Sequence, residues 1–70
     1  MRTIDLHNVR HRDVYYILEK HCINGDLPLT VITGNSTTMK KIVVQIATMF
    51  ELDAQEKLGN SGRLIIDESR

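Results

Sequence analysis

Apolar and polar positions in the first half of the chain predict a strand, a helix and a second strand. Residues 3–7 alternate between polar and apolar, which is typical of a half-buried strand with Asp5 and His7 on its outer face. From about residue 10 to residue 23 the apolar residues recur at helical spacing. Gly25 is suited to end that helix in a left-handed conformation. Residues 27–32 are apolar and β-branched, which favours a second strand.

The second half of the chain predicts a helix followed by a β-hairpin. The helix begins near Thr37, and its apolar stripe predicts a core face made of Met39, Ile42, Val43, Ile46, Met49 and Phe50. Residues 54–58 and 63–67 form two strands, which a turn at residues 59–62 connects. Right-handed crossovers place both helices on one face of the sheet. We therefore expect a single small two-layer α/β domain over residues 1–70, of βαβαββ order, with a mixed four-stranded sheet.

Composition narrows the class of protein and its compartment. Hydrophobic residues make up 41% of the 70 residues and charged residues 26%, which is typical of a globular domain. The longest apolar stretch, residues 42–50, is too short to span a membrane, and no signal peptide precedes the first strand. Cys22 stands alone, which excludes an internal disulfide and a cysteine-based zinc cluster. We expect a cytoplasmic protein without membrane association.

Bulk charge gives no argument for nucleic acid, because nine basic residues balance nine acidic ones. The distribution is uneven, since residues 1–50 carry six basic and four acidic side chains, and residues 51–70 carry three and five. The first half also holds all three histidines. A local positive patch and an ordinary mixed surface both remain open.

Asp5 and His7 are the candidate catalytic residues. If the first two strands are parallel neighbours, the end of the first strand meets the turn at Thr33 and Gly34 at the carboxyl edge of the sheet, where open α/β sheets bind ligands. The Asp5 carboxylate could hold the tautomer of His7, which could then act as general base or acid in phosphodiester cleavage. The alternative is that Asp5 caps the following turn and that His7 merely ends a strand.

The loop that opens the second helix is the candidate phosphate site. It is rich in hydroxyl groups and has no acidic residue, and Ser36 or Thr37 can cap the helix. Lys40 and Lys41 lie near the positive end of the helix dipole, where a bound phosphate would offset the unfavourable charge. Exposure of both lysines to water would also weaken the unfavourable interaction between their charges and the helix dipole.

Metal and cofactor sites find little support in the chain. His7 and His11 could form a pair of ligands, but no third ligand stands at zinc-like spacing. We predict no metal site and no small-molecule cofactor, and leave open whether the activity depends on a divalent metal.

Four segments resemble the Smr (small MutS-related) domain family, in order and over nearly the whole chain. Asp5-Leu6-His7-Asn8 resembles the Asp-Leu-His-Gly signature, with Asn8 in place of the glycine. Residues 31–34 are similar to the second strand and its Thr-Gly turn, although the usual second glycine after that turn is absent. Met39-Lys40 with Val43 is similar to the Leu-Arg plus apolar pattern of the second helix, and residues 60–66 to the Asn-x-Gly hairpin and last strand.

The resemblance implies a fold like the C-terminal domain of translation initiation factor 3, and nucleic-acid binding, often with endonuclease activity. It assigns cleavage to the Asp-Leu-His residues, here Asp5, Leu6 and His7, and nucleic-acid binding to the glycine turn, here residues 33–36. Together with the loop and lysines described above, the expected nucleic-acid-binding residues are Asn8, Thr33, Gly34, Asn35, Ser36, Thr37, Lys40 and Lys41.

Three functional hypotheses follow from these residues. The first is an Smr-like endonuclease that cleaves RNA or structured DNA. The second is a nucleic-acid-binding or ribosome-binding module without catalysis, which the two missing glycines favour. The third is a protein-interaction domain that retains only the fold. The expected partners are thus RNA or DNA, and a ribosome or another larger assembly.

Overall fold

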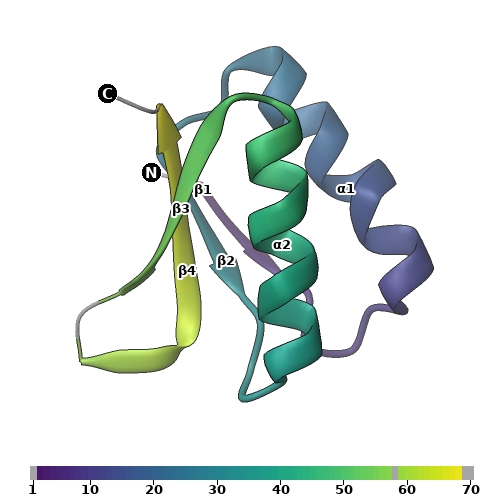
Figure 1. Ribbon diagram of the computed structural model, residues 1–70, viewed down its shortest axis with the longest axis vertical. Helices are drawn as coiled ribbons and strands as arrows, with labels where there is room; N and C mark the ends of the chain where they lie inside the picture. The colour runs from purple at the N-terminus through teal and green to yellow at the C-terminus, as the bar shows by residue number, and fades with distance from the viewer. Residues whose placement is uncertain (1, 58, 69–70) are drawn as a thin grey trace.

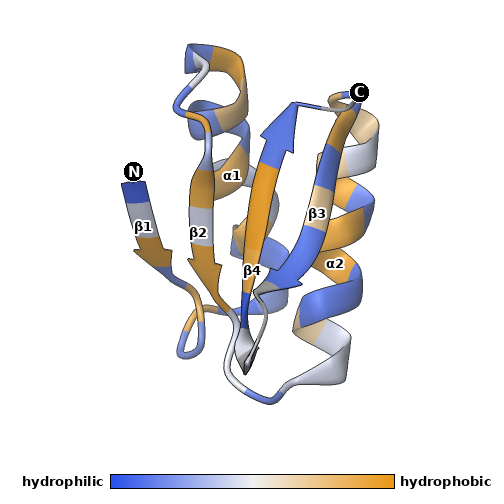
Figure 2. Ribbon diagram, turned by 90° about the vertical axis from the view of Figure 1, so that its left-hand side faces the viewer, coloured by the Kyte–Doolittle hydropathy of each residue, from blue (hydrophilic) through white to orange (hydrophobic). Residues whose placement is uncertain are grey.

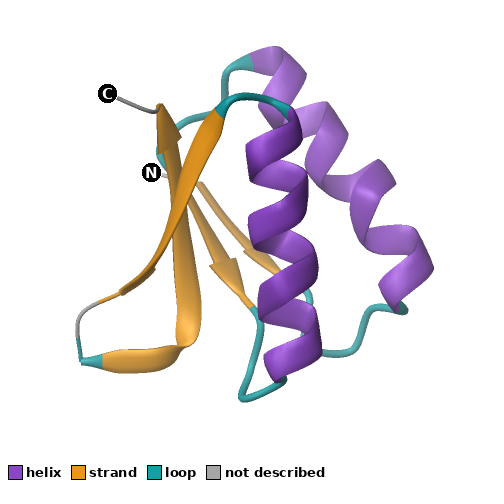
Figure 3. Cartoon of the chain, in the orientation of Figure 1, coloured by secondary structure: helices purple, strands orange, loops and turns teal. Residues whose placement is uncertain are grey.

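The computed structural model describes residues 2–57 and 59–68 and has the predicted βαβαββ order (Figure 3). Its elements are β1 (Arg2–Asp5), α1 (His11–Asn24), β2 (Leu29–Ile32), α2 (Thr37–Met49), β3 (Leu52–Lys57) and β4 (Asn60–Glu68). No helix within the described residues is long and apolar enough to cross a membrane.

The four strands form one mixed sheet with both helices on the same face, as predicted (Figure 1). The strand order is β1-β2-β4-β3, so that β1 and β3 are the two edges. β1 and β2 are parallel neighbours, whereas β4 is antiparallel to both β2 and β3. The face away from the helices carries no second layer of described residues (Figure 2). Because β1 and β2 are parallel neighbours, their carboxyl ends lie side by side.

The core lies between the sheet and the two helices. Strand β2 is central, and its Leu29 and Val31 are fully buried. Val14 from α1 and Val43 from α2 meet them from the helical layer. Burying each such side chain contributes about 1.5–3 kcal/mol. Met49, expected in the core, is 65% exposed instead, because at about 100° per residue it lies to one side of the face on which α2 buries Met39, Val43, Ile46 and Ala47.

Backbone chemistry ends and starts the helices where the sequence indicates. Gly25 adopts φ 71° and ends α1, its N–H donating to the carbonyl of Cys22. Ser36 precedes α2, and its hydroxyl accepts a hydrogen bond of 3.1 Å from the Met39 N–H. The predicted cap of α2 is therefore confirmed as Ser36, which places the loop before it at the sheet edge.

The hairpin differs from the predicted turn at residues 59–62. Strand β4 already begins at Asn60, and its register with β3 shifts between Glu56 and Lys57. The expected end of the preceding strand at Leu58 lies outside the described residues. Because β4 is longer than expected, Gly62 reaches the end of β2, where its carbonyl accepts hydrogen bonds from the N–H groups of Thr33 and Gly34.

Candidate functional site

Asp5 and His7 form a hydrogen-bonded pair at the end of β1. The backbone N–H of His7 donates to Oδ1 of Asp5 over 3.0 Å, and ring atom Nδ1 contacts the same oxygen. These hydrogen bonds, the ring contact first, lower the pKa of Asp5 below its ordinary 3.8. Since an ionised carboxylate is an acceptor only, the shared hydrogen belongs to Nδ1. About half of each side chain is exposed, 51% for Asp5 and 49% for His7, so that a ligand can reach the pair.

The local chain explains why the pair forms. Leu6 is fully buried, and its N–H donates to the carbonyl of Ile32, which extends the pairing of β1 with β2 by one residue. Alternation along the strand then turns Asp5 and His7 to the outer face. The buried leucine between them fixes their common direction.

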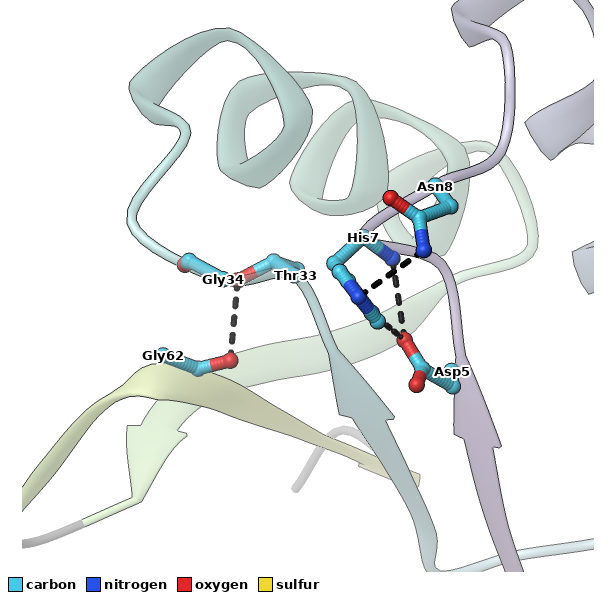
Figure 4. A network of polar contacts seen from close by, with 6 residues as sticks. All are labelled: Asp5, His7, Asn8, Thr33, Gly34 and Gly62. Atoms are coloured by element: carbon cyan, nitrogen blue, oxygen red, sulfur yellow. Dashed lines mark hydrogen bonds and ion pairs between the residues drawn. The ribbon is translucent and has the colours of Figure 1, made fainter.

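Asn8 occupies the second ring nitrogen of His7. Its Nδ2 lies 3.0 Å from Nε2 of the imidazole. An amide nitrogen donates only, so Nε2 acts as the acceptor, which corresponds to the neutral ring with its hydrogen on Nδ1. The contact with Asn8 therefore favours the tautomer in which Nε2 carries no hydrogen and can accept a proton. The same amide group also occupies the electron pair of Nε2, so that a substrate cannot reach it while Asn8 stays in this position (Figure 4).

The glycine turn after β2 lies directly against His7. Gly34 has φ 65°, and a Cβ atom built on it would lie 3.4 Å from the Cβ of His7. The Thr33 hydroxyl shares its one hydrogen between the Gly34 carbonyl at 3.0 Å and the Gly62 carbonyl at 3.2 Å (Figure 4). The backbone N–H groups of Thr33 and Gly34 donate to the same Gly62 carbonyl. The sequence-based expectation that His7 and Gly34 are adjacent is confirmed.

Some of the remaining loop residues make hydrogen bonds within the domain, and others have backbone groups that could bind a ligand. The backbone N–H groups of Thr33 and Gly34 donate within the domain and are not directed at a ligand. Asn35 and Ser36 are exposed, with Ser36 capping the helix. The N–H groups of Thr37 and Thr38, in the first turn of α2, have no partner within the helix by the geometry of a helix start.

Lys40 and Lys41 lie on the side of α2 that faces β3, at the other edge of the sheet from Asp5. Nζ of Lys40 is 3.2 Å from Oε1 of Glu56, and the lysine side chain is only 20% exposed. Together with Thr37 and Val44, both lysines line an open groove of about 470 Å³ between α2 and β3. The structure therefore does not bring these lysines together with His7.

Arg63 is a further side chain at the site, which the sequence did not single out. It pairs with Ile32 across β2 and β4, and Ile32 pairs with Asp5 across β1 and β2. Because Leu64 points to the core, Arg63 points to the open face, as Asp5 does. Arg63 belongs to the segment of residues 60–66 that resembles the family's last hairpin. Only the register of β4 shows that it lies in one row across the sheet with Ile32 and Asp5.

Charged side chains of the described residues separate between the two ends of the domain. Basic residues predominate where β1 and β2 end and the helices begin: Arg10, Arg12, Lys40, Lys41 and Arg63, against Asp5, Asp13 and Glu56. Acidic residues predominate at the opposite end: Glu19, Asp26, Glu51, Asp53, Asp67 and Glu68, against Arg2 and Lys20. A chain with no net charge thus presents a positive end, which also carries the Asp5–His7 pair.

Other reactive groups are placed away from ligand chemistry. Within residues 2–57 and 59–68, no group of three or more His, Cys, Asp or Glu side chains could hold a metal ion. Burial raises the pKa of the Cys22 thiol, which keeps it protonated and therefore a weak nucleophile.

No protein-family model, curated protein or solved structure matches this chain.

Proposed function

We propose that this chain is an Smr-type nucleic-acid-binding domain that cleaves phosphodiester bonds. The observation that supports the proposal most directly is the half-exposed Asp5–His7 pair, packed against the glycine turn at the carboxyl edge of the sheet. A carboxylate that orients an imidazole is the arrangement of a general base. The positive end of the domain gives this pair an environment that attracts a polyanion.

On RNA, the pair would act as follows. Nε2 of His7 takes the proton of a ribose 2′-hydroxyl, and the 2′-oxygen attacks the adjacent phosphorus. The bond from phosphorus to the 5′-oxygen breaks, and that oxygen leaves with a proton from water. The products are a 2′,3′-cyclic phosphate and a 5′-hydroxyl. Asp5, kept ionised by its lowered pKa, stabilises the imidazolium that forms.

A second candidate function is binding without cleavage, and Asn8 favours it. The Asn8 amide lies 3.0 Å from the ring nitrogen that would have to accept the substrate proton. Cleavage therefore requires that this amide rotate away when a substrate binds. If it stays, the domain holds nucleic acid at its positive end without turnover.

Cleavage of labelled RNA and DNA by wild type, Asp5→Asn and His7→Ala tests the first function. We expect both variants to lose about 10²–10⁴-fold in rate, because each removes a partner of the acid–base pair. His21→Ala is the matched control, since His21 also forms a pair with an aspartate, Asp26, at the opposite end of the domain. This control should cleave at the wild-type rate.

The same series separates the two functions. Equal residual cleavage in wild type, Asp5→Asn and His7→Ala would assign the activity to a contaminant and refute catalysis. Asn8→Ala should raise the rate if the amide only covers Nε2. Binding that weakens as salt rises, without turnover in wild type or Asn8→Ala, would instead support the binding module.

A further inference from the structure

Arg63 lies in the same row of the open sheet face as Asp5. The row runs from Asp5 on β1 through Ile32 on β2 to Arg63 on β4. Two strand spacings separate the Cα atoms of Asp5 and Arg63 by about 10 Å. An arginine side chain covers much of that distance, so its guanidinium group can approach a ligand bound at the Asp5–His7 pair.

The charge of Arg63 has no partner among the described residues. The side chain is partly buried, yet no ion pair or hydrogen bond links it to any of them. Lys40, which is also a partly buried cation at the positive end, is paired with Glu56. A guanidinium group is always charged and carries five donors in a planar fork, which suits the oxygens of a phosphate.

The backbone beside Arg63 is held in place relative to His7. The carbonyl of the preceding residue, Gly62, accepts hydrogen bonds of 2.9 Å and 3.1 Å from the N–H groups of Thr33 and Gly34. The Thr33 hydroxyl shares its hydrogen between this carbonyl, at 3.2 Å, and that of Gly34, at 3.0 Å. Gly34 in turn packs against the Cβ of His7. Contacts from Gly62 through Thr33 and Gly34 to His7, all drawn in Figure 4, therefore hold the backbone next to Arg63 in a fixed position relative to the imidazole.

We propose that Arg63 binds a phosphate group of the nucleic acid whose backbone lies at the Asp5–His7 pair. The proposal rests on the nucleic-acid function proposed above and adds a phosphate subsite to it. The partly buried Ile32 forms the apolar floor between the guanidinium and the catalytic pair, on which a ribose or base can rest. The bound strand would thus cross the open sheet face from β4 to β1.

Salt-titrated binding of a fluorescent single-stranded RNA by wild type, Arg63→Gln and Arg63→Lys tests this subsite. Arg63→Gln should weaken binding at low salt about ten- to hundredfold, because one charged hydrogen-bonding partner is lost. Its slope of log affinity against log salt should fall by about 0.7, the value for one phosphate contact on a single strand. Arg63→Lys should keep the slope and lose part of the affinity, because lysine keeps the charge without the planar fork.

Arg2→Gln is the matched control, because it makes the same chemical change at the opposite end of β1, where Arg2 pairs with Asp26. Thermal unfolding confirms that each variant is folded. If wild type binds with a salt-dependent affinity but Arg63→Gln has the slope of Arg2→Gln, the Arg63 subsite is refuted and the proposed function stands. If wild type does not bind even at low salt, the proposed function itself is refuted.

Discussion

Gly34 combines a backbone requirement with contact to the candidate base. Its φ of 65° lies in the left-handed region, and a Cβ atom on it would lie in van der Waals contact with the Cβ of His7, at 3.4 Å. Gly25 at the end of α1 has a similar φ of 71°, but a Cβ atom there would meet nothing within 4 Å. A comparison of substitutions at these two glycines therefore distinguishes the effect of backbone strain from the effect of contact with the imidazole.

Alanine at either glycine should destabilise the domain by about 1–2 kcal/mol, because both positions impose a left-handed backbone on an L-residue. Only Gly34→Ala should also shift the NMR signals of the His7 ring. Chemical denaturation measures the first effect, and a histidine-selective NMR spectrum measures the second. An unchanged His7 ring in Gly34→Ala would mean that the turn does not support the imidazole.

The lowered pKa of Asp5 gives a titration test of its pair with His7. In His7→Ala the Asp5 pKa should rise toward 3.8, because the hydrogen bond from ring atom Nδ1, the largest cause of the lowered value, is lost. The backbone N–H of residue 7 still donates to Asp5, so that the pKa stays below 3.8. In wild type the pairing stabilises the fold above that ordinary value, and the contribution disappears as pH falls through the lowered pKa. Carboxyl-carbon NMR measures the titration, and identical Asp5 curves in both proteins would exclude the pair.

At the scale of elements, the two helices begin differently. Ser36 caps α2 through its hydroxyl, whereas Arg10 precedes α1 without any side-chain cap. The uncapped start of α1 leaves arginine at the positive end of a helix dipole, which is unfavourable for stability. The arrangement nevertheless adds positive charge beside the candidate site.

Opposite substitutions at the two caps should change stability in opposite directions. Ser36→Ala should lower the free energy of unfolding by about 1 kcal/mol, because the Met39 N–H loses its acceptor. Arg10→Asn should raise it by a similar amount, since asparagine is a good cap and removes the unfavourable charge. Urea denaturation measures both. Destabilisation by Arg10→Asn would show that this arginine makes a structural contribution of its own.

At the scale of the whole molecule, periodicity and topology rules were sufficient for the architecture and for part of the site. The alternation of Ile4 and Leu6 with Asp5 and His7 indicates which side faces out, and the pairing of parallel strands brings His7 to Gly34. Those two expectations are confirmed, while the roles of the residues stay predictions.

Contacts that depend on the hairpin were beyond sequence reasoning. Lys40 meets Glu56, and Arg63 joins the row of Asp5, only because β4 pairs with both β2 and β3 in a particular register. Local patterns do not encode that register, and the shift between Glu56 and Lys57 alters it further. Met49 shows a different limit, because the apolar stripe of α2 is wider than the face that the sheet and α1 cover, and Met49 lies at the margin of that stripe.

The separation of charge between the two ends gives this neutral chain an electric dipole moment. In the field of a polyanion such a molecule experiences a torque before it makes contact, which turns its positive pole, and with it the Asp5–His7 pair at the end of β1, toward the phosphates. Because the net charge is zero, the electrostatic attraction between the domain and a distant polyanion is weak. The orientation of the domain, rather than a stronger attraction, would raise the fraction of productive encounters. Added salt shortens the range of that alignment to about 8 Å at physiological strength.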